Sequence, residues 1–414
     1  MSSRVPSSFS FPTTKDAANK ATLLRPITLV FFVVLLAGQF SFERIGMTNP
    51  LLIPERLFAM ILVTLVAGIV AFANIRRDSP AASSALIVSL PLLYALMTAA
   101  WGPNLPDEWE AVIDLICMLL ACLTAAMLLR WNRAVVAETF LWCAAVTGIV
   151  YSLAGLASSS AGERAAAFGG GPNVFSRITM MGLLAIVGLV IIRKLPRFAL
   201  IVTPLMVVAT IISGSRGGML AGLASICVLA PLLKRLRPMQ IFAGLALLTA
   251  CMVLVYRNFA DSVDQIIDGR IIVLTLNEGY TSGRGNLLRA ARDLFEQNFF
   301  FGAGLRGFED YYGNGFTYPH NLIMQTAAEG GAFGLIILLG SLTILLKRVV
   351  PQSSNPISVV FLAMASIIFV SSMFSGDYYD SRFLWIFLLL AINAPTPSLD
   401  ENDMNQANLR TGTS

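Results

Sequence analysis

The stretch 318–346, YPHNLIMQTAAEGGAFGLIILLGSLTILL, decides the fold of this 414-residue chain. A polar segment ends within it, and the apolar run 322–346 that follows is long enough to cross the ~30 Å hydrocarbon core of a bilayer. Similar runs recur along the chain, which is 56% hydrophobic and only 13% charged. Soluble proteins carry roughly a quarter charged residues. The sequence therefore predicts an all-α polytopic membrane protein.

The apolar runs predict about 12 transmembrane helices, nine in residues 23–256 and three in residues 322–394. Alternate short loops are basic and fall on the side of the basic N-terminal tail, which the positive-inside rule makes cytoplasmic. An even number of spans places both termini there, and the tails 1–22 and 395–414 are expected to be disordered. The predicted spans are 24–41, 57–75, 82–101, 111–129, 134–157, 174–192, 198–213, 217–233, 240–256, 322–346, 357–374 and 382–394.

A large loop, residues 257–321, separates the ninth and tenth predicted spans on the outer side. Loops longer than ~15 residues are usually functional or disordered, and the aromatic and apolar content of this one favours a folded, partly helical domain. In the segment TSGRGNLLRAARDLFEQN (281–298), apolar side chains recur with a helical period. We expect a helix with an apolar stripe made of Leu287, Leu288, Ala291, Leu294 and Phe295.

Two arginines stand at turns on the outer side. Arg284 lies at or just before the N-terminus of the predicted loop helix, where free backbone N–H groups and a guanidinium form an anion site; an ordinary capped surface helix is the alternative. Arg216, in SGSRGG (213–218), lies in a sharp turn between two apolar runs. A charge near membrane depth marks a functional site by default, although an arginine reaching out to lipid phosphates is also possible.

His320 is the only histidine of the chain. It follows Pro319 and precedes Asn321, a candidate N-cap for the span that starts near Leu322. An imidazole there can accept or donate a proton at neutral pH; a surface histidine without a role is the alternative. Glu329 lies further along the same span, beside a glycine-rich face, about half a turn out of phase with His320, so contact between the two is not predicted.

These segments together resemble the O-antigen ligase and O-antigen polymerase superfamily of bacterial envelopes. The histidine segment YPHNLIMQTAAEGGAFG (318–334) is the most specific, because PHN followed by E-G-G-x-x-G is typical of the family. The resemblance covers roughly residues 160–335. Its other motifs are RAAAFGGGPN (164–173), SGSRGG (213–218), SGRGNLLRAA (282–291) and FGAGLRGFE (301–309).

The resemblance implies a glycosyltransferase of the bacterial inner membrane that acts at the periplasmic face without a metal or another cofactor. The implied donor is a glycan on undecaprenyl diphosphate. In ligases the acceptor is a sugar of the lipid A-core, and in polymerases it is another lipid-linked repeat. The family's catalytic positions correspond to Arg216, Arg284 and His320 of this chain.

The chemistry of these side chains agrees with that expectation. Arginines at the diphosphate would stabilise the charge that develops on the leaving group, and a histidine base would activate a sugar hydroxyl. No Asp-x-Asp pattern occurs in the outer loops, and DYYD (377–380) lies in a short connector, so no metal site is predicted. Membrane lipids are expected partners and nucleic acid is not. The predicted substrate-binding residues are Arg164, Asn173, Arg306, Asn321 and Glu329.

Two other functions compete with the ligase. A polymerase of O-antigen or exopolysaccharide would use the same donor and similar motifs. A lipid or polysaccharide transporter would also suit twelve spans, but such folds usually contain repeats and charges buried at mid-membrane. The sequence shows no internal repeat, and most of the predicted spans are uncharged in their interiors. The polar residues gather on one face, which favours chemistry at the membrane surface.

Overall fold

The computed structural model describes residues 14–37, 53–72, 80–106, 108–158, 164–233, 284–313 and 315–395, with a few positions between 246 and 257. All regular secondary structure in this part is helical, apart from one isolated bridge between Ala167 and Gly170, as the all-α prediction requires. The longer helices are α1 (Thr14–Leu36), α2 (Ile53–Phe72), α3 (Pro80–Met97), α4 (Glu108–Ser158), α5 (Pro172–Ile191), α6 (Thr203–Ile212), α7 (Arg216–Leu233), α9 (Arg284–Gln297), α10 (Gly307–Tyr312), α11 (Leu322–Val349), α12 (Pro356–Ser372) and α13 (Arg382–Ile392).

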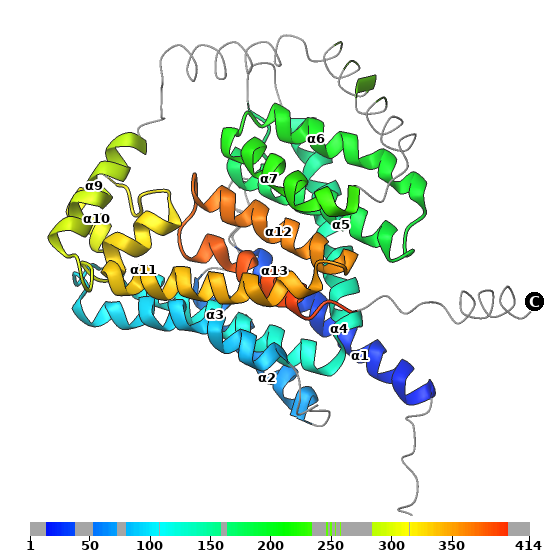
Figure 1. The fold of residues 1–414 in the computed structure, drawn as a ribbon, viewed down its shortest axis with the longest axis horizontal. Helices are drawn as coiled ribbons and strands as arrows, with labels where there is room; N and C mark the ends of the chain where they lie inside the picture. The colour runs from blue at the N-terminus through cyan, green and yellow to red at the C-terminus, as the bar shows by residue number, and fades with distance from the viewer. Residues whose placement is uncertain are drawn as a thin grey trace, which may run out of the picture.

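Short 3₁₀ helices continue or precede several of these elements. They are η2 (Thr98–Trp101) after α3, η3 (Arg197–Val202) before α6, η5 (Val350–Gln352) after α11 and η6 (Tyr379–Ser381) before α13. In Figure 1, α3, α11, α12 and α13 run along the long axis of the molecule, and α9 and α10 cover one end of α11. We call this end, which carries residues 284–312, the α9 end.

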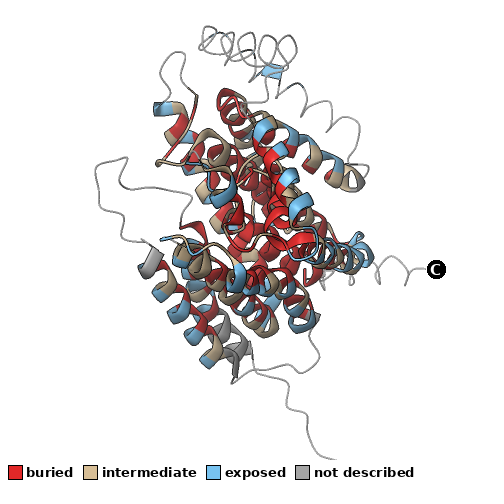
Figure 2. Cartoon of the chain, turned by 90° about the vertical axis from the view of Figure 1, so that its left-hand side faces the viewer, coloured by how far each residue is buried: buried red, intermediate tan, exposed pale blue. Residues whose placement is uncertain are grey.

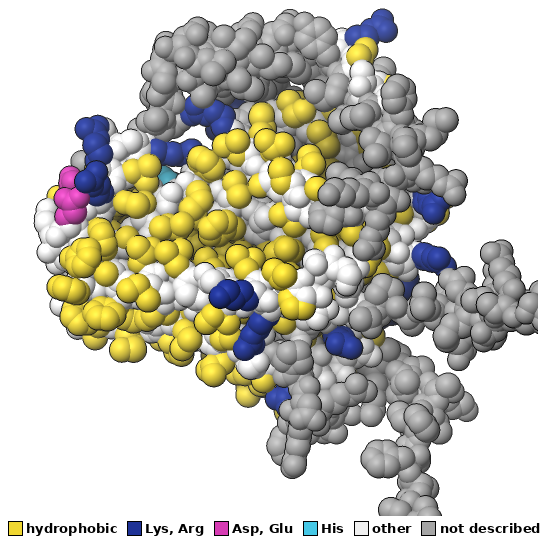
Figure 3. All heavy atoms as spheres, viewed as in Figure 1, with side chains coloured by type: hydrophobic (Ala, Val, Ile, Leu, Met, Phe, Trp, Pro, Cys, Tyr) yellow, Lys and Arg dark blue, Asp and Glu magenta, His cyan; other side chains and the backbone are white. Residues whose placement is uncertain are grey.

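The outside of the bundle is suited to lipid. Within the described residues, four segments are long and apolar enough to cross a membrane: Ala81–Trp101, Glu108–Ser158, Pro172–Ile191 and Leu322–Gln352. Apolar side chains also cover much of the face shown in Figure 3, and Ile69 is 74% exposed. An apolar surface of this extent marks contact with a membrane. The chain is therefore a multi-pass membrane protein, while the number of twelve spans stays a prediction.

Two predicted boundaries differ from the structure. The first helix begins at Thr14, inside the tail 1–22 that we expected to be disordered, because its segment is rich in alanine and lysine, which favour helix. The predicted spans 111–129 and 134–157 lie in one element, α4, broken only at Asn132. The Asn132 side chain accepts hydrogen bonds from the N–H groups of Ala134 and Val135, so it caps the second half of α4.

Some predictions lie outside the described residues. They concern most of the ninth span, 240–256, most of the first half of the loop 257–321, and nearly all of the tail 395–414. Most of the described helices share one large buried core, which fills the middle of the bundle in Figure 2, and a smaller buried cluster joins α9, α10 and α11. Close packing depends on small residues in places: a Cβ atom on Gly148 of α4 would stand 2.6 Å from the Cα atom of Gly182 on α5.

Candidate functional site

The turn between α6 and α7 places Arg216 at the first position of a helix. Gly214 adopts a positive φ of 59°, which lets the chain reverse sharply. The Ser215 hydroxyl accepts a hydrogen bond from the N–H of Gly218 (3.1 Å) and so caps α7. The same hydroxyl donates to Oδ1 of Asn173 at the start of α5 (2.8 Å). Asn173 thereby joins the N-termini of α5 and α7, and Arg216 lies half-buried beside them.

Arg164 supports this turn from the preceding loop. Its Nε donates to the carbonyl of Ser213 (2.9 Å) and its Nη2 to the carbonyl of Gly214 (3.3 Å). These carbonyls follow the C-terminus of α6, where a cation is favoured by the helix dipole. We expected Arg164 to bind substrate; the structure places its guanidinium against the backbone of the turn that presents Arg216.

Helix α9 begins at Arg284, as the sequence predicts. Leu287, Ala291 and Leu294 of the predicted stripe are buried, together with Ala290, while Leu288 and Phe295 are only half-buried. The buried face packs against α10 and α11. Burial, and then the neighbouring charge of Arg216, lower the pKa of the Arg284 guanidinium. The two arginines, 68 positions apart in the chain, therefore lie within electrostatic reach of each other.

His320 occupies the loop directly before α11. It has a positive φ of 57°, an uncommon conformation for a residue with a side chain. Its ring packs edge-on against the ring of Tyr318, with 4.5 Å between the centroids, and its Nδ1 is buried without a hydrogen-bond partner among the described residues. Burial, and then the charge of Arg284, lower the pKa of His320, while Asp380 acts in the opposite direction. The imidazole is therefore kept neutral at pH 7.

Arg216, Arg284 and His320 thus come together from three segments of the chain. Arg284 links the group, because its charge acts on His320 and the charge of Arg216 acts on Arg284. Figure 3 shows basic side chains beside the histidine, above the apolar surface of the bundle. Two cations next to a neutral imidazole can bind an anion and accept a proton from a group beside that anion.

The residues that follow α12 contact both the loop that carries His320 and the turn that carries Arg216. Asn321 caps α11, as predicted, by accepting a hydrogen bond from the N–H of Met324 (3.0 Å). Its Nδ2 donates to the carbonyl of Met373 (3.2 Å). On the other side, a Cβ atom on Gly217 would stand 2.9 Å from the side chain of Phe374. The loop of His320 and the turn of Arg216 are thereby held on the same helix end.

The glycine-containing segment 299–304 pairs backbone to backbone with α11. Helix α11 is broken at Gly331, which has φ 64° and ψ −163°, and residues 299–304 run alongside the break. The N–H groups of Ala303 and Gly304 donate to the carbonyls of Ala328 and Glu329, and those of Ala332 and Phe333 donate to Phe299 and Phe300. A Cβ atom on Gly302 or Gly331 would collide with the opposite backbone. The sequence assigned Gly331 to a glycine-rich face of the helix; in the structure it forms a backbone-to-backbone joint with Gly302.

Arg306 and Glu329, which were also predicted to bind substrate, each contact another side chain of the protein. The Arg306 guanidinium, which follows the joint at a positive φ of 58°, pairs with Glu309 at 2.6 Å. The Glu329 side chain is 1% exposed, and its Oε2 accepts a hydrogen bond from Gln325 (3.3 Å). Arg306 and Glu329 lie on the wall of one cavity, whereas Arg164 and Asn173 belong to the turn of Arg216.

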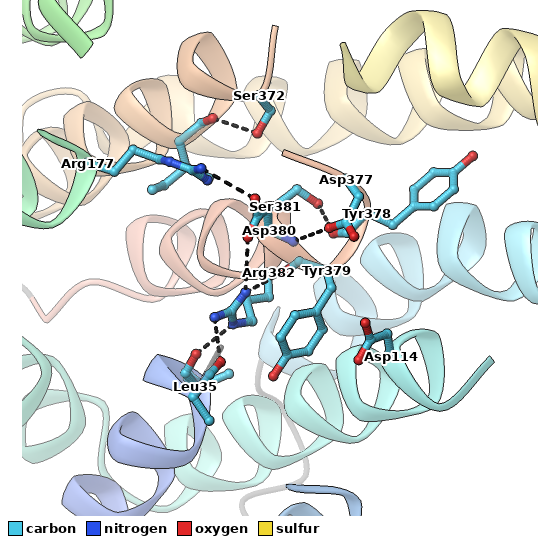
Figure 4. A network of polar contacts seen from close by, with 12 residues as sticks. Leu35, Asp114, Arg177, Ser372, Asp377, Tyr378, Tyr379, Asp380, Ser381 and Arg382 are labelled. Atoms are coloured by element: carbon cyan, nitrogen blue, oxygen red, sulfur yellow. Dashed lines mark hydrogen bonds and ion pairs between the residues drawn. The ribbon is translucent and has the colours of Figure 1, made fainter. Parts of the chain in front are cut away.

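The connector 375–381 also contributes to the site, which was not predicted from the sequence. Asp380 forms an ion pair with the buried Arg177 of α5 (3.3 Å), and its N–H donates to Asp377 (2.9 Å). Arg382 donates to backbone carbonyls of α1 and of Tyr379, as Figure 4 shows. The Asp380 carboxylate is also the negative charge that acts on His320. The DYYD motif was a visible signal, but its partner Arg177 is 203 positions away.

Metal-ligating side chains do not converge in the described part of the chain. No group of three or more His, Cys, Asp or Glu residues there is arranged to hold a metal ion.

Comparison with known proteins gives a match over part of the chain. A search of curated proteins finds no relative. Residues 200–339 match the family model described as O-Antigen ligase. The matched region runs from η3 to the middle of α11 and includes Arg216, Arg284 and His320. The match spans about a third of the chain, so it shows that this region is similar to the O-antigen ligase family.

Proposed function

We propose that this protein is an O-antigen ligase that moves a glycan from undecaprenyl diphosphate to a sugar hydroxyl of the lipid A-core, at the periplasmic face of the inner membrane. One observation carries the proposal: Arg284 lies within electrostatic reach of both Arg216 and His320. The match to the O-antigen ligase family covers the same three residues and supports the reaction class.

The two arginines would bind the diphosphate of the donor. Each stands at the first position of a helix, α7 or α9, where the helix dipole also favours an anion. A guanidinium offers several donors in a planar fork that matches phosphate oxygens. Preorganised positive charge at the leaving group is worth most in the transition state, when the sugar–phosphate bond breaks.

His320 would act as the general base. A neutral imidazole accepts the proton of the acceptor hydroxyl while that oxygen forms a bond to the anomeric carbon of the donor. The bond from the anomeric carbon to the phosphate oxygen breaks, and its electron pair leaves with undecaprenyl diphosphate. The lowered pKa of His320 keeps the ring in the form that this step needs.

A transfer assay in reconstituted membranes tests the proposal. Purified protein receives undecaprenyl-diphosphate glycan, with lipid A-core in one tube and no added acceptor in the other. We expect glycosylated lipid A-core in the first tube and undecaprenyl diphosphate released in equal amount. Longer lipid-linked chains without lipid A-core would instead establish a polymerase. An intact donor in both tubes would reject a glycosyltransferase and favour a transporter.

A further inference from the structure

A polar cavity of about 80 Å³ adjoins the loop of His320. Its wall includes Tyr318, whose ring packs against the imidazole. The other walls come from α4, α11, the connector before α13, and Leu305 and Arg306 before α10, so the cavity extends from the candidate base toward the interior of the bundle. A water needs about 10–15 Å³ of such space, so the cavity accommodates several hydroxyl-sized groups.

Three carboxyl groups and one cation line the cavity, and the cation, Arg306, is paired with Glu309 outside the wall. Of its three carboxylates, only Asp114 has an ion-pair partner, Arg56. Glu329 and Asp377 form no ion pair within the described part of the chain, and burial, followed by the charge of Asp380, raises the pKa of Asp377. Carboxyl groups in this state both donate and accept hydrogen bonds. The acids are not arranged around a metal position.

Buried polar atoms without partners also occur in this wall. The Gln325 side chain is 5% exposed and the Tyr379 side chain 6% exposed. Oε1 of Gln325 and the hydroxyl of Tyr379 have no hydrogen-bond partner in the described structure. A buried polar group without a partner is costly, so these two atoms point to a polar occupant of the cavity.

We propose that this cavity is the acceptor subsite and that it selects a sugar without phosphate or carboxylate groups. The inference rests on the proposed function. Arg216 and Arg284 attract the diphosphate, whereas the cavity wall offers hydroxyl or amino groups hydrogen bonds with its carboxyl groups and offers an anion no unpaired cation. A sugar ring whose polar edge enters the cavity presents one further hydroxyl to the imidazole, on the side of Tyr318.

The variant Tyr379→Phe tests the subsite with little disturbance, because the ring stays between its neighbours. Arg56 and Arg382 lie over that ring, at 4.1 and 4.0 Å from its centroid, and keep their contacts. Losing one hydrogen bond to the acceptor should raise the KM for lipid A-core about fivefold to tenfold. The KM for the donor and kcat should change less than twofold, and the thermal unfolding midpoint should not fall.

A second test concerns selectivity. Lipid A-core is compared with the same acceptor oxidised to a carboxylate at C6 of its terminal sugar. The wild type should use the oxidised form at least tenfold less well in kcat/KM, and Glu329→Gln with Asp377→Asn should remove most of this difference. Asp310→Asn is the matched control, because Asp310 is an exposed acid of α10 outside the cavity wall, and it should keep the full difference.

The outcomes separate the two hypotheses. If the wild type transfers glycan, and all cavity variants change only the KM for the donor, the acceptor subsite is wrong while the proposed function stands. Equal use of both acceptors by the wild type would also reject the subsite. If the wild type leaves the donor intact with every acceptor, the proposed function fails and the subsite fails with it.

Discussion

His320 is the residue on which the chemistry depends, and its surroundings explain why. The ring is half-buried, its backbone is strained at a positive φ, and the cation Arg284 lies within electrostatic reach. Strained backbone of this kind costs of order 1–3 kcal/mol and gathers at functional sites. The sequence identified the residue because it is the only histidine, but the field that lowers its pKa depends on contacts that no spacing predicts.

The pH dependence of transfer should reflect the lowered pKa of His320. The rate should stay level around pH 7 and fall on acidification only below the ordinary histidine pKa near 6.5, because protonation removes the base. Protein labelled at histidine and free of a histidine tag gives a single imidazole NMR signal, so the titration can be followed directly. A pKa at or above 6.5 would contradict the burial and the influence of Arg284.

The contribution of Arg284 to the lowered pKa of His320 can be tested by substitution. Arg284→Gln removes the positive charge near the imidazole, so the NMR pKa of His320 should move upward. Arg289→Gln is the control: Arg289 lies on the exposed face of the same helix and binds Asn286, so its loss should leave the titration unchanged. An equal shift in both variants would show that helix α9, rather than the Arg284 charge, sets the pKa.

Substitutions of Arg216 test whether binding of the donor requires the planar guanidinium or only a positive charge. A lysine keeps the charge but loses the planar fork. Arg216→Lys should therefore lower kcat/KM for the donor nearly as much as Arg216→Ala, by about 10²- to 10³-fold. Arg197→Lys, at an exposed position before α6 and away from the site, should have no effect. Full activity of Arg216→Lys would refute bidentate binding.

At the scale of elements, the start of α9 at Arg284 and the cap of α11 at Asn321 could be predicted, because both follow from local patterns. The joint between residues 299–304 and the break in α11 could not. Its hydrogen bonds pair two segments across the bundle, and glycine spacing alone fits both a packing face and a joint. The connector 375–381 escaped prediction for the same reason, since Arg177 and Leu35 are distant in sequence.

The joint should be sensitive to a single methyl group. Gly331→Ala forces a side chain into a conformation open essentially to glycine, at about 1–3 kcal/mol, and against the carbonyl of Phe300. We expect a lower thermal unfolding midpoint and slower transfer. Gly340→Ala in the same helix meets nothing within 4 Å and has no positive φ. It should leave transfer unchanged and be neutral or stabilising, because alanine favours helix; equal damage from both would reject the joint.

At the scale of the molecule, the composition predicted an all-helical membrane protein, which the described residues confirm. The number of spans and their orientation depend on a bilayer and on segments outside the described part. The candidate site brings together side chains from α7, from α9, from the loop before α11 and from the connector before α13. Such long-range placement follows from tertiary packing and is not contained in the local pattern of the chain.

The charge at the diphosphate is expected to come from the protein itself. Treatment with EDTA, followed by removal of the chelator, should leave the initial rate of transfer unchanged, because Arg216 and Arg284 would hold the leaving group. The rate is measured from labelled glycan on lipid A-core. A loss of activity that Mg²⁺ restores would contradict the prediction that the leaving group is held without a metal.

The most direct test of His320 as the base in glycosyl transfer is the amount of undecaprenyl diphosphate released per glycan transferred. It is measured in liposomes with the wild type and with His320→Ala. We predict that the wild type releases one undecaprenyl diphosphate per glycan transferred. The variant should form neither product, although it folds and inserts into the membrane as well as the wild type does. Substantial transfer by His320→Ala would remove the imidazole as base. An intact donor with the wild type would contradict glycosyl transfer altogether.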